Sequence, residues 1–135
     1  MIYLDMDGVI ADFFGGIEEL FDVEHWKDVD FRNVAYAKLR NTDFFYKLKP
    51  FYENKKDISL AIVNHVKEIS WENEIDWGIC SSPLRYDHNN SAYHKRRWLE
   101  FQDFMPKVSN CIFTSNKHKY AWSEIDSKPN ILVDD

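Results

Sequence analysis

The sequence predicts an α/β fold in which a parallel sheet of Rossmann-like topology has helices on both faces. Three observations favour this fold. In the second half of the chain, short apolar runs alternate with helical segments, which is the pattern of βαβ units. Several of these runs end in polar residues, as strands do at the carboxyl edge of a parallel sheet. A length of 135 residues allows one domain with a substantial core.

The composition narrows the class of protein. Hydrophobic residues make up 44% of the chain and aromatic residues 16%, which excludes a disordered or low-complexity protein. Because 23 Asp and Glu outnumber 17 Lys and Arg, the formal charge is −6, which argues against long nucleic acid as a partner. No run approaches the roughly 18 apolar residues of a membrane helix, so we expect no membrane partner. The two cysteines and the acidic start indicate a reduced, cytoplasmic setting.

The first half of the chain predicts one strand and several helices. Ile2–Leu4 is short, apolar and followed by an acidic residue, so we expect a buried strand. The spacing of apolar residues predicts a helix over residues 12–21, and residues 23–46 predict short helices and loops. The strongest amphipathic pattern runs from Lys55 to Trp71, with His65 on its apolar stripe as an expected core residue.

The second half predicts a regular alternation of strands and helices. Strands are expected at residues 75–80, 108–113 and 131–133, where apolar residues are continuous. Helices are expected at residues 93–105, before Pro106, and at residues 116–124. In this alternation, the predicted helices would connect one parallel strand to the next.

Polar side chains follow the predicted strands, where the carboxyl ends of parallel strands meet at one edge. We therefore expect carboxylates, hydroxyls and an ammonium group to gather there. Like charges so close need a cation, and all-oxygen ligands favour Mg²⁺ over zinc. With that ion, the set has what phosphoryl transfer requires: a nucleophilic carboxylate, an acid and a positive charge. The residues in question are Asp5, Asp7, Ser81, Ser82, Lys117, Asp134 and Asp135.

In this order and spacing, the residues resemble the four motifs of the haloacid dehalogenase superfamily of phosphatases. Within it, the chain is similar to the 5′(3′)-deoxyribonucleotidase family, and the resemblance covers essentially the whole chain. The stretches that carry it are Asp5-Met6-Asp7-Gly8-Val9-Ile10-Ala11-Asp12-Phe13, Phe44-Phe45 before Leu48-Lys49-Pro50, Ile79-Cys80-Ser81-Ser82-Pro83, Tyr93-His94-Lys95 with Trp98, Asn116-Lys117, and Asp134-Asp135 after an apolar run.

The resemblance implies a role for each of these site residues. Asp5 would be the nucleophile that forms an aspartyl-phosphate, and Asp7 the general acid and then the general base. Phosphoryl oxygens would be bound by hydroxyl and ammonium groups, namely those of Ser81, Ser82, Lys95 and Lys117, with Lys119 as the alternative to Lys117. Mg²⁺ would be held by Asp5, Asp134, Asp135 and the main-chain carbonyl of Asp7.

The resemblance also implies a single domain over residues 1–135, with a small helical cap inserted at about residues 14–74. Such a cap would cover the site and select the substrate. Phe13, Phe44 and Phe45 are candidates for stacking against a nucleotide base.

The chain departs from the family pattern at three places. Ser81 stands where the family commonly has Thr, and this difference keeps a hydroxyl group at the position. Pro50-Phe51-Tyr52-Glu53 replaces a Pro-Gly-Ala turn of the cap. The sequence ends at Asp135, where relatives usually continue into further structure.

We therefore expect a Mg²⁺-dependent phosphatase that acts on a small phosphomonoester, a deoxyribonucleoside monophosphate. Two alternatives stay open. One keeps the chemistry and changes the substrate, either to the 3′-phosphate of a nucleic-acid end or to small phosphomonoesters in general. The other is a non-catalytic protein of the same fold that binds phosphate or another protein.

Overall fold

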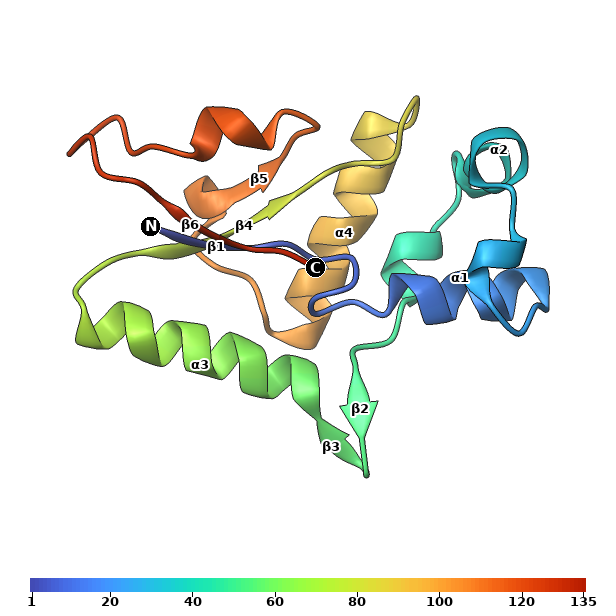
Figure 1. Ribbon diagram of the computed structural model, residues 1–135, viewed down its shortest axis with the longest axis horizontal. Coiled ribbons are helices and arrows are strands. Elements are labelled where there is room, and N and C mark those ends of the chain that lie inside the picture. The colour runs from blue at the N-terminus through green and yellow to red at the C-terminus, as the bar shows by residue number, and fades with distance from the viewer.

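A computed structural model describes residues 1–135 and has a four-stranded parallel sheet at its centre (Figure 1). The strand order is β5-β4-β1-β6, with Leu4 of β1 opposite Ile79 on one side and Val133 on the other. Successive connections move outward from β1 to β4 and β5 and then return to β6. This reversal beside β1 is the switch point at which ligands bind in such sheets. The strands are β1 (Ile2–Leu4), β4 (Trp77–Ser81), β5 (Cys111–Phe113) and β6 (Ile131–Val133).

The mixed α/β class with a parallel sheet is confirmed, and the two faces of the sheet are covered differently. Side chains alternate along β1, so Ile2 and Leu4 share one face and Tyr3 lies on the other. Ile2 and Leu4 join one apolar core with residues of α3 (Ile58–Glu72) and α4 (His88–Gln102). On the other face, the Tyr3 ring contacts Tyr120 of η5, a short 3₁₀ helix (Lys117–Tyr120). The two long helices therefore share a face, and a single turn lies against the opposite one.

The segment between β1 and α3 begins with a group of short helices at one end of the molecule. Figure 1 shows α1 (Phe13–Phe21) and α2 (Tyr36–Leu39) beside each other, away from the sheet. Asp12 caps α1, since its carboxylate accepts a hydrogen bond of 3.0 Å from the Gly15 amide. The remaining short helices are η1 (Trp26–Asp28), the π-helix η2 (Phe31–Ala35) and the 3₁₀ helix η3 (Phe44–Lys47). The expectation of short helices and loops over residues 23–46 is confirmed.

The strongest predicted helix begins three residues later than expected because a hairpin precedes it. Tyr52–Glu53 (β2) pairs with Lys56–Asp57 (β3) across a turn in which Asn54 and Lys55 have positive φ angles of 49° and 65°. α3 then begins at Ile58 and packs against the core of the sheet, although it lies within the range proposed for the cap.

The expectation that His65 of this helix lies in the core is wrong. His65 is exposed, because the buried face of α3 is rotated toward Ser59, Val63, Val66 and Ser70.

The second half of the chain follows the predicted alternation with shifted boundaries. α4 begins at His88, five residues before the expected start, and ends at Gln102, where Asp103 takes a left-handed φ of 60°. Residues 108–110 form a 3₁₀ turn (η4), so the third strand is limited to Cys111–Phe113. The helix expected over residues 116–124 is reduced to η5. None of the helices combines the length and apolar character needed to cross a membrane.

Candidate active site

Three carboxylates from distant parts of the sequence meet at the carboxyl edge of the sheet. Asp5 directly follows β1, and Asp134 and Asp135 directly follow β6, its hydrogen-bonded neighbour. Carboxylate oxygens of the three residues lie within 4.8 Å of one another. The parallel pairing of β1 and β6 brings them together, as the sequence pattern predicted.

Lys117 provides the nearest positive charge to this acidic cluster. It is the first residue of η5, and its Nζ lies 3.0 Å from Asp5 Oδ2 and 3.5 Å from Asp134 Oδ2. Lys119, the alternative left open by the sequence, is exposed and forms no ion pair. Of the two lysines, Lys117 is therefore the one placed to act in the site.

Burial changes the acidity of the cluster. The pKa of Asp5 is raised from 3.8 to about 6, mainly by desolvation and further by the hydrogen bond with Asp134, while Lys117 opposes the rise. The same hydrogen bond lowers the pKa of Asp134. Burial acts to lower the pKa of Lys117, but Asp5 and Asp134 outweigh it and leave that pKa raised. Asp5 therefore carries its negative charge at a cost that a bound cation would relieve.

A second lysine reaches the site from α4. Lys95 is 1% exposed, and its Nζ donates to Asp7 Oδ2 at 2.9 Å, to Ser81 Oγ at 3.0 Å and to the Ser82 carbonyl at 2.7 Å. The ammonium also lies 4.8 Å from the centroid of the Phe45 ring, within cation–π range. Lys95 thus joins Asp7 to the residues that end β4.

The turn after β1 needs glycine at position 8. Gly8 has a φ of 80°, and a Cβ atom there would lie 2.5 Å from Asp135 Oδ2. Amide groups of Val9, Ile10 and Ala11 all donate to the Met6 carbonyl, so the turn is tight. The absence of a side chain lets the Asp135 carboxylate approach the turn closely.

A pocket of about 310 Å³ opens over Asp5 and Asp7, and four of its eleven lining residues are aromatic. Phe13 and Phe45, two of the predicted base-stacking residues, line it, with rings 6.0 Å apart and nearly parallel at 12°. Phe44 does not line the pocket and packs edge-on against Phe13. Ser82 and Asp135 also line it. Sequence reasoning missed the five other lining residues, Phe14, Tyr36, Pro83, Leu84 and Arg85.

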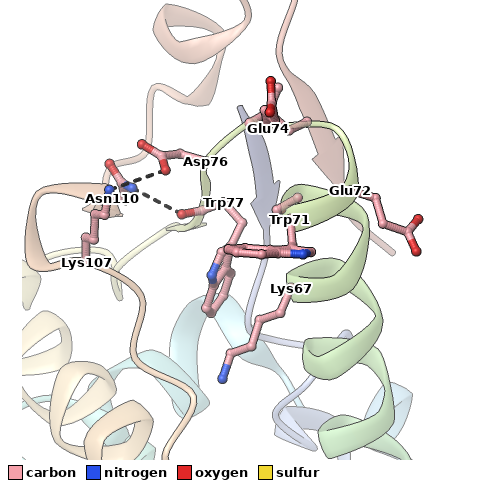
Figure 2. A pocket seen from close by; sticks show the side chains of 10 residues that line it. Lys67, Trp71, Glu72, Glu74, Asp76, Trp77, Lys107 and Asn110 are labelled. Atoms are coloured by element: carbon pink, nitrogen blue, oxygen red, sulfur yellow. Dashed lines mark hydrogen bonds and ion pairs between the residues drawn. The ribbon is translucent and has the colours of Figure 1, made fainter.

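A larger groove lies elsewhere in the molecule. This groove of about 690 Å³ is lined by residues from the end of α3 and the start of β4, including Trp71 and Trp77 (Figure 2). It therefore lies at the amino end of β4, whereas Ser81 ends that strand at the carboxyl edge. Of its two lysines, Lys107 is paired with Asp76 at 3.4 Å. None of the residues gathered around Asp5 lines this groove.

A scan against protein-family models and a search of curated proteins gave no match to this chain. The donor set is suited to a hard cation, because the three clustered side chains offer only oxygen. In addition, Asp7 Oδ1 is buried and has no hydrogen-bond partner. This oxygen is therefore available to exchange a proton or a hydrogen bond with a bound group.

Proposed function

We propose that the protein is a Mg²⁺-dependent phosphatase of the haloacid dehalogenase type, which hydrolyses deoxyribonucleoside monophosphates. The observation that carries this proposal is the meeting of Asp5, Asp134 and Asp135 within 4.8 Å, with Lys117 3.0 Å from Asp5. An acidic cluster next to a lysine, under an aromatic pocket, suits an anionic substrate that carries a flat base.

Asp5, Asp134, Asp135 and the main-chain carbonyl of Asp7 would hold the metal ion. Bound there, Mg²⁺ would offset the repulsion between the carboxylates and the phosphate and stabilise charge on the phosphoryl oxygens. The ion and Lys117 would act on the same carboxylate, since Asp5 is the residue that both contact in this assignment.

The side chains of Asp5 and Asp7 would form the covalent bond and transfer the protons. An Asp5 oxygen forms a bond to phosphorus while the bond from phosphorus to the sugar oxygen breaks, and Asp7 gives a proton to that leaving oxygen. Asp7 then takes a proton from water, which attacks the aspartyl-phosphate, releases phosphate and frees Asp5. Lys95 would hold the Asp7 side chain in position, because its ammonium lies 2.9 Å from the Asp7 carboxylate. It would also favour the charged form of Asp7 that takes the proton from water.

Hydrogen-bond donors at the carboxyl edge of the sheet would bind the phosphoryl group. Ser81 Oγ lies 3.0 Å from Lys95 Nζ, and Ser82 lies at the pocket wall. Lys95 would exchange one of its three hydrogen bonds in the protein for a bond to a phosphoryl oxygen. Above them, Phe13 and Phe45 offer ring surfaces for the base. The volume of about 310 Å³ is in the range of a small-ligand site, which favours a nucleotide over a larger substrate.

The variant Asp5→Asn tests the proposal. It keeps the shape of the side chain and removes the nucleophilic charge, so we expect phosphate release from deoxynucleotides to fall by about a thousandfold or more. Chelation of Mg²⁺ in the wild-type protein is expected to have a similar effect. The measurement is phosphate release over a panel of nucleotides. Asp103→Asn, at an exposed position after α4, is the matched control and should keep full activity.

Two results would contradict this function. Full activity of Asp5→Asn would remove the assigned nucleophile, and activity unchanged by chelator would remove the metal. If Mg²⁺ binds and no substrate of the panel is turned over, the non-catalytic alternative is favoured instead.

A further inference from the structure

We propose that the mouth of the pocket holds a second anion-binding subsite, formed by Arg40 and Arg85 around Tyr86, for a second phosphate group of the substrate. This inference rests on the proposed phosphatase function and narrows it. The preferred substrate would be a nucleotide with a phosphate or phosphodiester in addition to the phosphate that is removed.

Two segments distant in sequence build this subsite. Arg85 and Tyr86 lie between β4 and α4, and the Arg85 Cζ is 5.0 Å from the centroid of the Tyr86 ring. Arg40 directly follows α2, and its Cζ is 5.2 Å from the same centroid. Arg85 also lines the pocket that contains Asp5, so the subsite adjoins the reacting groups.

Hydrogen bonds between neighbouring residues hold the two segments together. The Asn41 amide donates to Asp87 Oδ2 at 3.0 Å, and Asn90 Nδ2 donates to the Thr42 carbonyl at 3.0 Å. The Asp87 side chain is buried, which favours a fixed geometry for this contact. The neighbours of Arg40 and Tyr86 are therefore linked directly, and the two guanidinium groups are held near one ring.

Neither arginine has an acidic partner in the protein. The ion pairs of the structure all involve lysine, and neither Arg40 nor Arg85 forms a side-chain hydrogen bond, although the chain has 23 acidic residues. Both residues are exposed. Guanidinium groups bind phosphate through two parallel hydrogen bonds, so two unpaired ones beside a phosphatase site suit an anionic ligand.

Tyr86 is positioned unusually for its size. Its φ of 66° lies in the left-handed region, where bulky residues are rare, and its side chain is 72% exposed. The ring keeps both guanidinium groups within stacking distance and leaves aromatic surface open to solvent. The exposed ring therefore keeps the two guanidinium groups near each other, where one phosphate group can reach both.

A simple monophosphate would leave this subsite unused. Its single phosphate belongs at the sheet edge, where Lys117 and Lys95 lie, and Arg85 is the one cationic residue that lines the pocket. A second phosphate would reach Arg85 and Arg40 from the same bound nucleotide. Such a group occurs both in a nucleoside 3′,5′-bisphosphate and in the 3′-phosphorylated end of an oligonucleotide.

The test is equilibrium binding to the Asp5→Asn protein in Mg²⁺, measured by titration calorimetry. The probes are thymidine 5′-monophosphate, thymidine 3′,5′-bisphosphate and a 3′-phosphorylated thymidine dinucleotide. We expect one or both of the last two probes to bind about tenfold more tightly than the monophosphate, the gain of a charge-assisted pair of hydrogen bonds. The tighter of these two identifies the source of the second phosphate.

Substitutions assign the gain to the two arginines. Arg40→Ala and Arg85→Ala should each bring the ratio of bisphosphate to monophosphate affinity toward one, and Arg40→Lys should keep part of it. Arg97→Ala is the matched control, because Arg97 also stacks on tyrosine, with its Cζ 4.0 Å from the Tyr46 centroid, and lies outside the pocket. It should leave the ratio unchanged. Circular dichroism checks that each variant folds.

Equal affinity for all probes, binding of none of them, or a gain that survives both alanine substitutions would overturn the subsite. Failure of the phosphatase function gives a different result. In that case wild-type protein hydrolyses none of the probes, while the affinity ratio and its dependence on Arg40 and Arg85 persist. Hydrolysis of the monophosphate without any preference among the probes would instead leave the function standing and remove the subsite.

Discussion

At the scale of single residues, Asp5 has the side chain whose charge depends most on its surroundings. Burial raises its pKa from 3.8 to about 6, so the folded protein binds a proton that the unfolded chain releases between these pH values. Stability from this group is therefore present at low pH and is lost as the pH rises through about 6. The lowered pKa of Asp134 has the opposite effect on stability. Stability from Asp134 is present above pH 3.8 and is lost as the pH falls below that value.

This difference predicts how Asp5→Asn changes stability with pH in the metal-free protein. Asparagine does not titrate, so the free energy of unfolding of the variant relative to wild type should increase between pH 4 and pH 7. A shift of this size corresponds to at most roughly 3 kcal/mol. Urea denaturation at several pH values, in chelator, measures it. A difference that does not change with pH would contradict the assigned burial of the Asp5 charge.

Gly8 gives a second prediction at this scale. Gly8→Ala places a Cβ where Asp135 Oδ2 now lies and adds about 1 kcal/mol of left-handed strain, so we expect weaker Mg²⁺ binding by calorimetry. Gly78→Ala separates this effect from general destabilisation, because its Cβ would meet the Asn110 carbonyl beside β4 instead. Equal loss of Mg²⁺ affinity in the two folded variants would argue against a local role of Gly8.

At the scale of elements, the sequence pattern predicted the helices and strands whose buried residues are apolar. β1 was predicted because its run of apolar residues is buried on both faces. The hairpin of β2 and β3 was missed because its residues are largely polar and exposed, which leaves no alternating pattern to detect. The early start of α4 was missed for a related reason. Buried residues of this helix include Ser91 and Lys95, so polar groups occupy part of its inner face.

The first turn of α3 depends on one serine. Ser59 Oγ donates to the Ile10 carbonyl at 2.7 Å and accepts from the Phe51 amide at 2.8 Å, and the residue is fully buried. It therefore joins α3 to the turn after β1 and to the hairpin. Ser59→Ala should lower the free energy of unfolding by about 1–3 kcal/mol, because it leaves buried backbone groups unpaired.

Ser70 on the same helix is the matched control. It is also buried, but its hydroxyl has no hydrogen-bond partner. Ser70→Ala should therefore change the unfolding free energy little or raise it slightly. Urea denaturation measures both variants, and a similar loss in each would show that the two hydrogen bonds of Ser59 do not hold α3 in place.

At the scale of the whole molecule, the candidate site was predictable where it depends on strand order alone. Asp5, Ser81 and Asp134 each stand at a strand end, so a correct sheet brings them together. Tyr36 and Arg85 were not predictable in this way. They meet at the pocket because the segment containing α2 folds back toward the loop before α4, and no local pattern in the sequence encodes that contact.

The assembled cluster predicts that Mg²⁺ stabilises the whole fold. An ion that binds only the folded state at about a hundred times its Kd adds about 2.7 kcal/mol, which is several degrees in melting temperature. Calorimetric melting with Mg²⁺, with chelator and with NaCl of equal ionic strength measures this effect. Asp134→Asn should abolish most of the rise. A rise of the same size in NaCl alone would mean charge screening without a specific site.

Asp5 and Asp134 meet in space although nearly the whole described sequence separates them. A ribosome must add all the residues between Asp5 and Asp134 before the two side chains can meet. Until then, a nascent chain carries the Asp5 carboxylate without its partners from the end of β6. If the proposed metal site is correct, ion binding would have to wait until β6 joins the sheet.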